Sequence, residues 1–235
     1  MTARRRLKAR DRLIVALDEG RLSAALALAR RLRGTAGWVK IGSILFTAHG
    51  PEAVQRVRAL GFRVMLDLKF HDIPSTVEAS ARSAARLRAS LMTVHASGGA
   101  PMLEAAVRGA RQEARRLRIA PPKILAVTVL TSVGGGRSRD VLGLARTALN
   151  AGCDGVVASA REAKALRAAF GPKPLIVCPG VRPAWAASND QQRIATPAEA
   201  IASGASALVV GRPITAAADP RQAAARILRE MEDGG

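Results

Sequence analysis

Short runs of strand-forming residues alternate along the chain with segments rich in Ala, Leu and Arg. These segments place apolar residues at helical spacing, as in Leu22, Leu26, Ala29 and Leu32. Eight runs resemble β-strands in length and composition, at residues 13–17, 38–41, 64–70, 91–95, 124–130, 155–158, 175–178 and 207–210. Eight strand–helix units within 235 residues predict an α/β fold, a single (β/α)8 TIM barrel. A doubly wound parallel sheet is the alternative, but such a sheet rarely needs eight such even repeats.

The alternation continues without a linker or a low-complexity segment, which indicates one domain. We expect residues 1–12 to form a basic N-terminal extension and residues 13–235 to form the barrel. Proline is expected at the first helical position after Thr196 and after Asp219. Three helix starts carry the Ser/Thr-x-x-Glu pattern of a capping box, at Ser75–Glu78, Ser159–Glu162 and Thr196–Glu199.

The formal net charge of +19 comes almost entirely from arginine, with 31 Arg against 6 Lys. Basic chains can bind nucleic acids or anionic membranes. Here the arginines are scattered along expected helices, without zinc-ligand spacing, a helix-turn-helix pattern or stacking aromatic residues. No apolar run approaches the twenty residues of a membrane span, and no secretory-type apolar stretch follows the basic start. We therefore expect no specific nucleic-acid partner, no membrane span and a cytoplasmic location.

The cysteines and histidines show no metal-binding pattern. Cys153 and Cys178 lie in apolar surroundings, which predicts buried free thiols of a reducing compartment. His49, His71 and His95 stand singly, and no group of histidines and carboxylates has ligand spacing. We expect structural roles for these histidines and no metal site.

Asp67 and Lys69 place opposite charges near the end of an expected buried strand. Side chains two residues apart share a face, so these two point to one side while Leu66 and Leu68 point to the other. Charges on an inner face are costly unless they are paired. The pair is therefore either a structural ion pair or a set of charges kept for chemistry, and the residues at the other strand ends favour chemistry.

Polar and glycine residues follow nearly every expected strand, at the end where (β/α)8 barrels carry their active sites. Two of the six lysines, Lys40 and Lys69, lie on expected inward faces. Gly211 and Arg212 follow the eighth strand, where such barrels commonly bind phosphate through backbone N–H groups and an Arg. Gly180 and Arg182, after the seventh strand, would complete that pocket. The neighbouring carboxylates would keep Lys69 charged, so that it could donate a proton.

Together these segments resemble the orotidine 5′-phosphate decarboxylase family over essentially the whole chain. The family pattern Asp-x-Lys-x-x-Asp-Ile-Pro is met by Asp67, Lys69, Asp72, Ile73 and Pro74. The supporting segments follow in order, at residues 15–18, 40–42, 46–48, 93–96, 130–132, 179–183, 190–193 and 210–214. The segment at residues 190–193 is similar to the bacterial branch.

The resemblance implies decarboxylation of orotidine 5′-monophosphate to UMP, the last step of de novo pyrimidine synthesis, without a cofactor or a metal. It implies a catalytic network of Lys40, Asp67, Lys69 and Asp72, in which Lys69 stabilises and protonates a C6 carbanion. It also implies a homodimer in which Asp72 and Thr76 reach the neighbouring site. Asp18 and Lys40 would bind the ribose, and Thr131 and Ser132 would face the pyrimidine. The 5′-phosphate would be bound by Arg182, Gln191, Gly211 and Arg212.

Two other functions remain open at this point. Sugar-phosphate decarboxylases and aldolase-like synthases of the same fold share the Asp-x-Lys-x-x-Asp core but use Mg²⁺ to stabilise an enediolate. The Ile-Pro-x-Thr continuation at residues 73–76 and the Gln-bearing loop argue against them. A basic scaffold that binds nucleic acid and has lost activity is the other alternative, and the complete set of charged residues argues against it.

Overall fold

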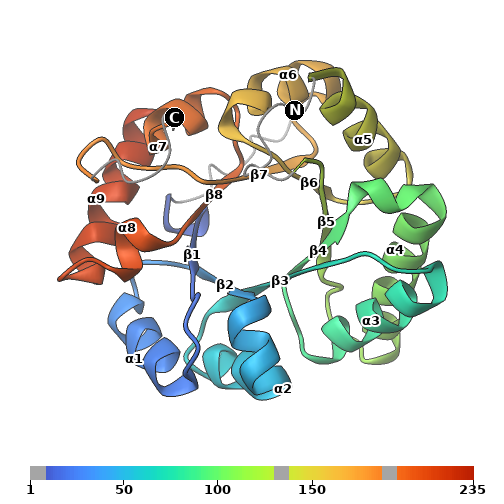
Figure 1. Ribbon diagram of the computed structural model, residues 1–235, viewed down its shortest axis with the longest axis horizontal. Coiled ribbons are helices and arrows are strands. Elements are labelled where there is room, and N and C mark those ends of the chain that lie inside the picture. The colour runs from blue at the N-terminus through green and yellow to red at the C-terminus, as the bar shows by residue number, and fades with distance from the viewer. Residues whose placement is uncertain (1–8, 130–137, 187–194) are drawn as a thin grey trace.

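A closed barrel of eight parallel strands forms the centre of the molecule (Figure 1), in a computed structural model that describes residues 9–129, 138–186 and 195–235. The strands follow chain order around the barrel, and β8 pairs with β1 to close it. An open doubly wound sheet would leave two edge strands, so the predicted (β/α)8 TIM barrel is confirmed. The strands are β1 (Leu13–Ala16), β2 (Trp38–Gly42), β3 (Arg63–Phe70), β4 (Leu91–His95), β5 (Lys123–Val127), β6 (Gly155–Val157), β7 (Leu175–Pro179) and β8 (Ala207–Val210).

Helices surround the strands on the outside of the ring, as Figure 1 shows. The α-helices are α1 (Leu22–Leu32), α2 (Ser43–Ala59), α3 (Pro74–Arg86), α4 (Gly99–Arg116), α5 (Ser138–Asn150), α6 (Ala160–Phe170), α7 (Pro197–Ala202), α8 (Arg212–Thr215) and α9 (Pro220–Asp233). Two 3-10 turns, η1 (Ala9–Asp11) and η2 (Ala96–Gly98), precede β1 and follow β4. None of the helices in the described part of the chain is long and apolar enough to cross a membrane.

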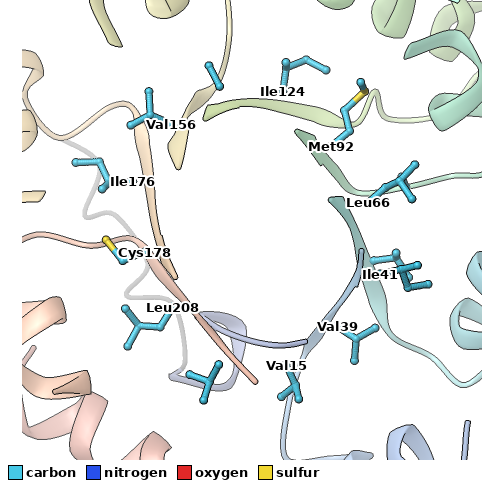
Figure 2. Packing of buried hydrophobic residues seen from close by; sticks show 14 of the residues in the cluster. Val15, Val39, Ile41, Leu66, Met92, Ile124, Val156, Ile176, Cys178 and Leu208 are labelled. Carbon is cyan, nitrogen blue, oxygen red and sulfur yellow. The ribbon is translucent and has the colours of Figure 1, made fainter. Parts of the chain in front are cut away.

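The alternation of side chains along the strands divides the core into two layers. Residues that face the helices form the larger cluster, and Figure 2 shows Val39, Ile41 and Leu66 on the outer side of the ring. Residues at the intervening positions, such as Met65 and Leu91, form a separate cluster inside the barrel. Two residues after Met65 on β3, and two residues after Leu91 on β4, the inward position is occupied by a polar side chain. The strand alternation therefore directs polar groups into the barrel near the carboxyl ends of these strands.

The strands lie where the sequence predicts them, with small differences at their ends. β5 ends at Val127 instead of continuing towards residue 130, which lies outside the described residues. At the start of the chain, the side chain of Arg12 donates hydrogen bonds to the carbonyls of Ala205 and Ser206, at 2.8 and 3.1 Å. The end of the expected basic extension is thus joined to the residues that precede β8.

Two of the three predicted capping boxes are present, and the third prediction is wrong. Ser159 and Thr196 cap α6 and α7 as expected. At α3, however, Pro74 occupies the first helical position and Ile73 is the N-cap residue, so Ser75 already lies inside the helix. Glu78 instead forms ion pairs with Arg82 and with Arg108 of α4. A contact between two helices thus replaces the local cap.

Cys153 and Cys178 are both buried and free, which confirms the prediction for the two thiols. Burial raises the pKa of each thiol to about 12. Both side chains therefore remain protonated at neutral pH and pack as small apolar groups.

Candidate active site

Charged side chains gather where the carboxyl ends of β1, β2 and β3 meet. Lys40 lies on β2, Asp67 lies on β3, and Asp18 follows β1 by two residues. The ends of parallel strands form one rim of the barrel, which brings these distant parts of the sequence together. Lys40 Nζ lies 2.9 Å from Asp18 Oδ1 and 3.6 Å from Asp67 Oδ2. The lysine therefore bridges a half-exposed carboxylate and an enclosed one.

Asp67 is the most enclosed member of this group, with 9% of its surface exposed. Its Oδ2 accepts a hydrogen bond from Lys69 Nζ at 2.9 Å, and its Oδ1 accepts one from Thr93 Oγ1 at 2.9 Å. An enclosed carboxylate is costly unless it is paired and hydrogen-bonded. The Asp67 carboxylate is surrounded by two ammonium groups and one hydroxyl group. The structure brings Asp67 and Lys69 together as their spacing predicts.

Glycine at position 42 leaves room for the network. A Cβ atom at Gly42 would lie 2.9 Å from Lys40 Nζ and 3.5 Å from Asp18 Oδ1. Any side chain there would displace the ammonium group from its position between the two carboxylates. The Lys40-Ile41-Gly42 sequence at the end of β2 therefore supplies both the cation and the space that it needs.

The backbone of Lys69 has an unusual conformation, with a φ of 50°. Residues other than glycine rarely adopt positive φ, because the Cβ atom crowds the backbone. Such backbone strain persists where the surrounding structure enforces it, and it is frequent at active sites. The strain here coincides with a shift in the β3–β4 register between Leu66 and Phe70.

Asp72 and Thr76 are exposed in the single chain. Asp72 Oδ1 accepts a hydrogen bond from the backbone N–H of Ile73 at 2.6 Å, and among the described residues Asp72 forms no ion pair. Both residues line a cavity of about 500 Å³ together with Lys69 and His95. The structure thus places Asp72 beside the same cavity as Lys69 but outside the ion-paired network.

Three of the four residues expected to bind the phosphate are described: Arg182 follows β7, and Gly211 and Arg212 follow the neighbouring strand β8. Gly180 has a φ of 72°, a conformation that favours glycine. A Cβ atom at Gly211 would lie 3.9 Å from Asp18 Oδ2, which places this backbone beside the charged network. Arg212 is exposed and begins α8, and Arg182 is half-buried. Gly211 therefore lies next to the network, across the β8–β1 pair.

A second cavity, of about 510 Å³, lies at the opposite end of the barrel. Its lining is mainly apolar and includes Trp38 and Leu91, and its charged residues include the Asp11–Arg63 ion pair but neither Lys40 nor Lys69. We therefore place the candidate site at the carboxyl end. In the described ranges, no three His, Cys, Asp or Glu residues are grouped so that they could bind a metal ion.

Comparison with known proteins gives the same assignment over nearly the full chain. Residues 11–227 match the model of the orotidine 5′-phosphate decarboxylase / HUMPS family. The chain belongs to this family. The orotidine 5′-phosphate decarboxylase of Paramagnetospirillum magneticum is 49% identical, over 92% of this chain and 97% of that protein. The corresponding protein of Moorella thermoacetica is 50% identical, over 97% and 94%.

The fold of the family is seen in a solved relative. The crystal structure of the orotidine 5′-phosphate decarboxylase from Lactobacillus acidophilus superposes with a TM-score of 0.82 at 36% identity. The match covers 94% of this chain and 99% of that one. The predictions that the chain is an enzyme of this family and that it forms a single closed barrel are thus confirmed.

Not every residue expected from the family pattern can be placed. Asp18, Lys40, Asp67 and Lys69 form one connected network, and Gly211 lies beside it. Three further expected substrate-binding residues lie outside the described residues: Thr131, Ser132 and Gln191. Their roles in orotidine 5′-phosphate decarboxylase chemistry stay predictions.

Two features of the site were not predicted from the sequence. Thr93 belongs to one of the supporting segments, and its inward position two residues after Leu91 is the signal that points to it. The rings of His71 and His95 lie 5.4 Å apart at the ends of β3 and β4. Burial, followed by the electrostatic interactions with His71 and Lys69, lowers the pKa of His95 and so favours its neutral imidazole.

Proposed function

We propose that this chain decarboxylates orotidine 5′-monophosphate to UMP and CO₂, the last step of de novo pyrimidine synthesis. The observation that carries the proposal is the Asp18–Lys40–Asp67–Lys69 network at the carboxyl end of the barrel. The near full-length similarity to orotidine 5′-phosphate decarboxylases supports the choice of substrate. The two buried free thiols support a reducing compartment, and we propose the cytoplasm as the place of action.

The electrostatics of the network suit the loss of CO₂ from C6 of the pyrimidine. Breaking the bond between C6 and the carboxylate leaves an electron pair on C6, in a vinyl carbanion without an adjacent electron sink. An ammonium group already fixed beside C6 stabilises this charge as it develops, since no dipole has to reorganise during the reaction. In our proposal Lys69 is that group, because Asp67 holds its Nζ at 2.9 Å.

Lys69 then completes the reaction by donating a proton to C6. The product is UMP, and the resulting amine of Lys69 regains its proton from solvent. Asp67 would lie close to the substrate carboxylate. Repulsion between the two negative charges would raise the free energy of the bound substrate more than that of the transition state. Lys40, between Asp18 and Asp67, would hold both carboxylates in place and contact the ribose hydroxyls. This scheme needs no cofactor and no metal ion.

Binding of the phosphate would orient the substrate from the far side of the pocket. Arg182, Gly211 and Arg212 follow β7 and β8, while Lys69 belongs to β3, so the two ends of the nucleotide would contact separate strands. Binding energy from a group remote from the reacting carbon can be used to position that carbon. Gln191 would add a contact to the same phosphate, and Thr131 and Ser132 would face the pyrimidine.

We further propose a homodimer in which Asp72 and Thr76 reach the neighbouring site. Ile73, between them, is 64% exposed, and Ile44 on α2 is 55% exposed. A groove of about 590 Å³ between α2 and α3, lined by Phe46, Phe70 and other residues, includes Thr76 itself. Exposed apolar side chains beside an apolar groove are typical of an interface. A second subunit at this surface would cover them and bring its own Asp72 close to Lys69.

The test is the loss of orotate ultraviolet absorbance when purified protein is added to orotidine 5′-monophosphate in the presence of EDTA. We expect fast, metal-independent loss with the wild-type chain and none with Lys69→Ala. A folded wild-type protein that leaves the absorbance unchanged would refute the proposed reaction. Mg²⁺-dependent turnover of a sugar phosphate, abolished by EDTA, would instead establish the alternative enediolate chemistry.

A further inference from the structure

The ladder between β3 and β4 contains an irregularity beside the charged network. Leu66 pairs with Met92 and Phe70 pairs with Val94, so the three residues 67–69 of β3 lie opposite the single residue Thr93 of β4. Two residues of β3 are therefore in excess at this point. Bulges of this kind redirect side chains and are frequent next to active sites. The regular hydrogen bonds between the two strands therefore cannot pair all the backbone N–H and C=O groups of the bulge.

The side chain of Thr93 takes the place of the missing ladder contacts. Its Oγ1 accepts a hydrogen bond from the backbone N–H of Lys69 at 2.9 Å and donates one to Asp67 Oδ1 at 2.9 Å. A hydroxyl group can make both bonds, because it has one proton to donate and lone pairs that accept. Thr93 is fully buried, with no exposed surface, so water cannot substitute for either bond.

These two bonds fix both charged groups of the bulge. The bond to Oδ1 sets the rotation of the Asp67 carboxylate and leaves Oδ2 towards Lys40 and Lys69. The bond from the Lys69 N–H holds the backbone at a φ of 50°, which this residue would otherwise avoid. The backbone conformation in turn sets the direction in which the side chain of Lys69 leaves the backbone. One hydroxyl thus sets the direction of the carboxylate and of the ammonium group.

We propose that Thr93 is a positioning residue for the reaction, acting through its hydroxyl on Asp67 and Lys69. The inference rests on the proposed function, since positioning matters only if Lys69 and Asp67 act on the substrate. Displacing a reacting group by about 1 Å can cost on the order of 100-fold in rate. Loss of the hydroxyl should therefore lower kcat much more than it raises KM, because Thr93 is fully buried and offers the substrate no exposed surface.

The experiment compares variants that differ in the hydroxyl. Thr93→Val keeps the size and removes the hydroxyl, while Thr93→Ser and Thr93→Ala both lack the methyl group and differ only in the hydroxyl. With orotidine 5′-monophosphate as substrate, we expect Thr93→Val and Thr93→Ala to lose roughly 10- to 100-fold in kcat with KM within about 3-fold. Thr93→Ser should retain kcat within about 3-fold of wild type. Thr128→Val is the control, since Thr128 is buried just after the end of the neighbouring strand β5 and its hydroxyl, among the described residues, bonds the Val157 carbonyl and no member of the network.

A second readout does not depend on activity. Hydrogen exchange at the Lys69 amide should be faster in Thr93→Val and Thr93→Ala than in Thr93→Ser and wild type, because the amide loses its acceptor. Equal kcat in Thr93→Val and wild type, or equal losses in Thr93→Ser and Thr93→Ala, would overturn the proposal. Failure of Thr93→Ser to fold would also overturn it, by making Thr93 a residue of fold stability. A wild-type chain without turnover would refute the proposed function, while the exchange rates would still decide whether the hydroxyl holds Lys69.

Discussion

Lys69 and Asp67 are two residues apart in β3, and Lys69 Nζ lies 2.9 Å from Asp67 Oδ2. The same oxygen lies 3.6 Å from Lys40 Nζ, so one carboxylate faces two ammonium groups. The two lysines therefore remain close together because Asp67 offsets their repulsion. Removing one lysine should leave the other paired and the network largely intact.

We expect Lys69→Ala to abolish measurable turnover of orotidine 5′-monophosphate while UMP still binds. Loss of a single preorganised group that stabilises transition-state charge costs about 100- to 1,000-fold in kcat. Loss of the proton donor adds to this, so the decrease should exceed roughly 1,000-fold. Steady-state kinetics and calorimetric titration with UMP measure the two effects. A variant that retains turnover would contradict the role of Lys69 as the proton donor.

Arg212→Ala should weaken nucleotide binding much more than it affects the fold, because Arg212 is exposed and begins the short helix α8. A hydrogen bond to a charged group contributes about 1.5–3 kcal/mol, which corresponds to roughly 10- to 100-fold in affinity. Titration with UMP and with uridine separates the phosphate contact from the rest. We expect weaker binding of UMP and unchanged binding of uridine. The exposed Arg229 on α9 provides the control variant, Arg229→Ala, and equal losses in both variants would exclude a specific phosphate contact.

A mixture of Asp72→Asn and Lys69→Ala proteins should recover activity if Asp72 acts in the neighbouring site. After subunit exchange, each mixed dimer would contain one site with both native residues. Random exchange of equal amounts makes half of the dimers mixed, which predicts roughly one quarter of the wild-type activity. The control mixes Lys69→Ala with Asp67→Asn, because Asp67 and Lys69 contact each other within one chain and no intact site can form. Equal absence of recovery in both mixtures would argue against shared sites.

The barrel could be predicted because its signals are local. Each strand is a short apolar run, and the helices between the strands repeat their apolar residues at helical spacing. The pairing of Asp67 with Lys69 follows from strand alternation, and the place of Lys40 and Asp18 follows from the common rim of parallel strands. These steps require only the order of residues and the closure of the barrel.

The bulge in β3 and the contacts of Thr93 could not be predicted in this way. The three residues opposite Thr93 become visible only when the registers on both sides are known. The capping box wrongly predicted at the start of α3 has a similar cause. Glu78 interacts with Arg108, thirty residues away, instead of capping its own helix. Sequence patterns identify local preferences, and contacts between distant segments can override them.

The ion-pair cluster of Glu113 should make the fold sensitive to acid. Hydrogen bonds from Arg116 and Arg86 lower the pKa of Glu113 from its usual 4.5 to about 2. The unfolded chain therefore binds this proton at higher pH than the folded protein does. The stability that Glu113 contributes is fully present above about pH 4.5 and is lost as the pH falls towards 2.

Glu113→Gln should accordingly lower the free energy of unfolding at pH 7 and flatten its decrease between pH 4.5 and pH 2. Urea unfolding at a series of pH values measures both effects. Glu104→Gln is the matched control, because Glu104 lies on the same helix with its side chain exposed. High salt should reduce the difference between Glu113→Gln and wild type, since both arginines extend into solvent and salt screens exposed pairs. If the two glutamine variants have the same pH dependence, the arginine pair does not set the acid stability of this fold.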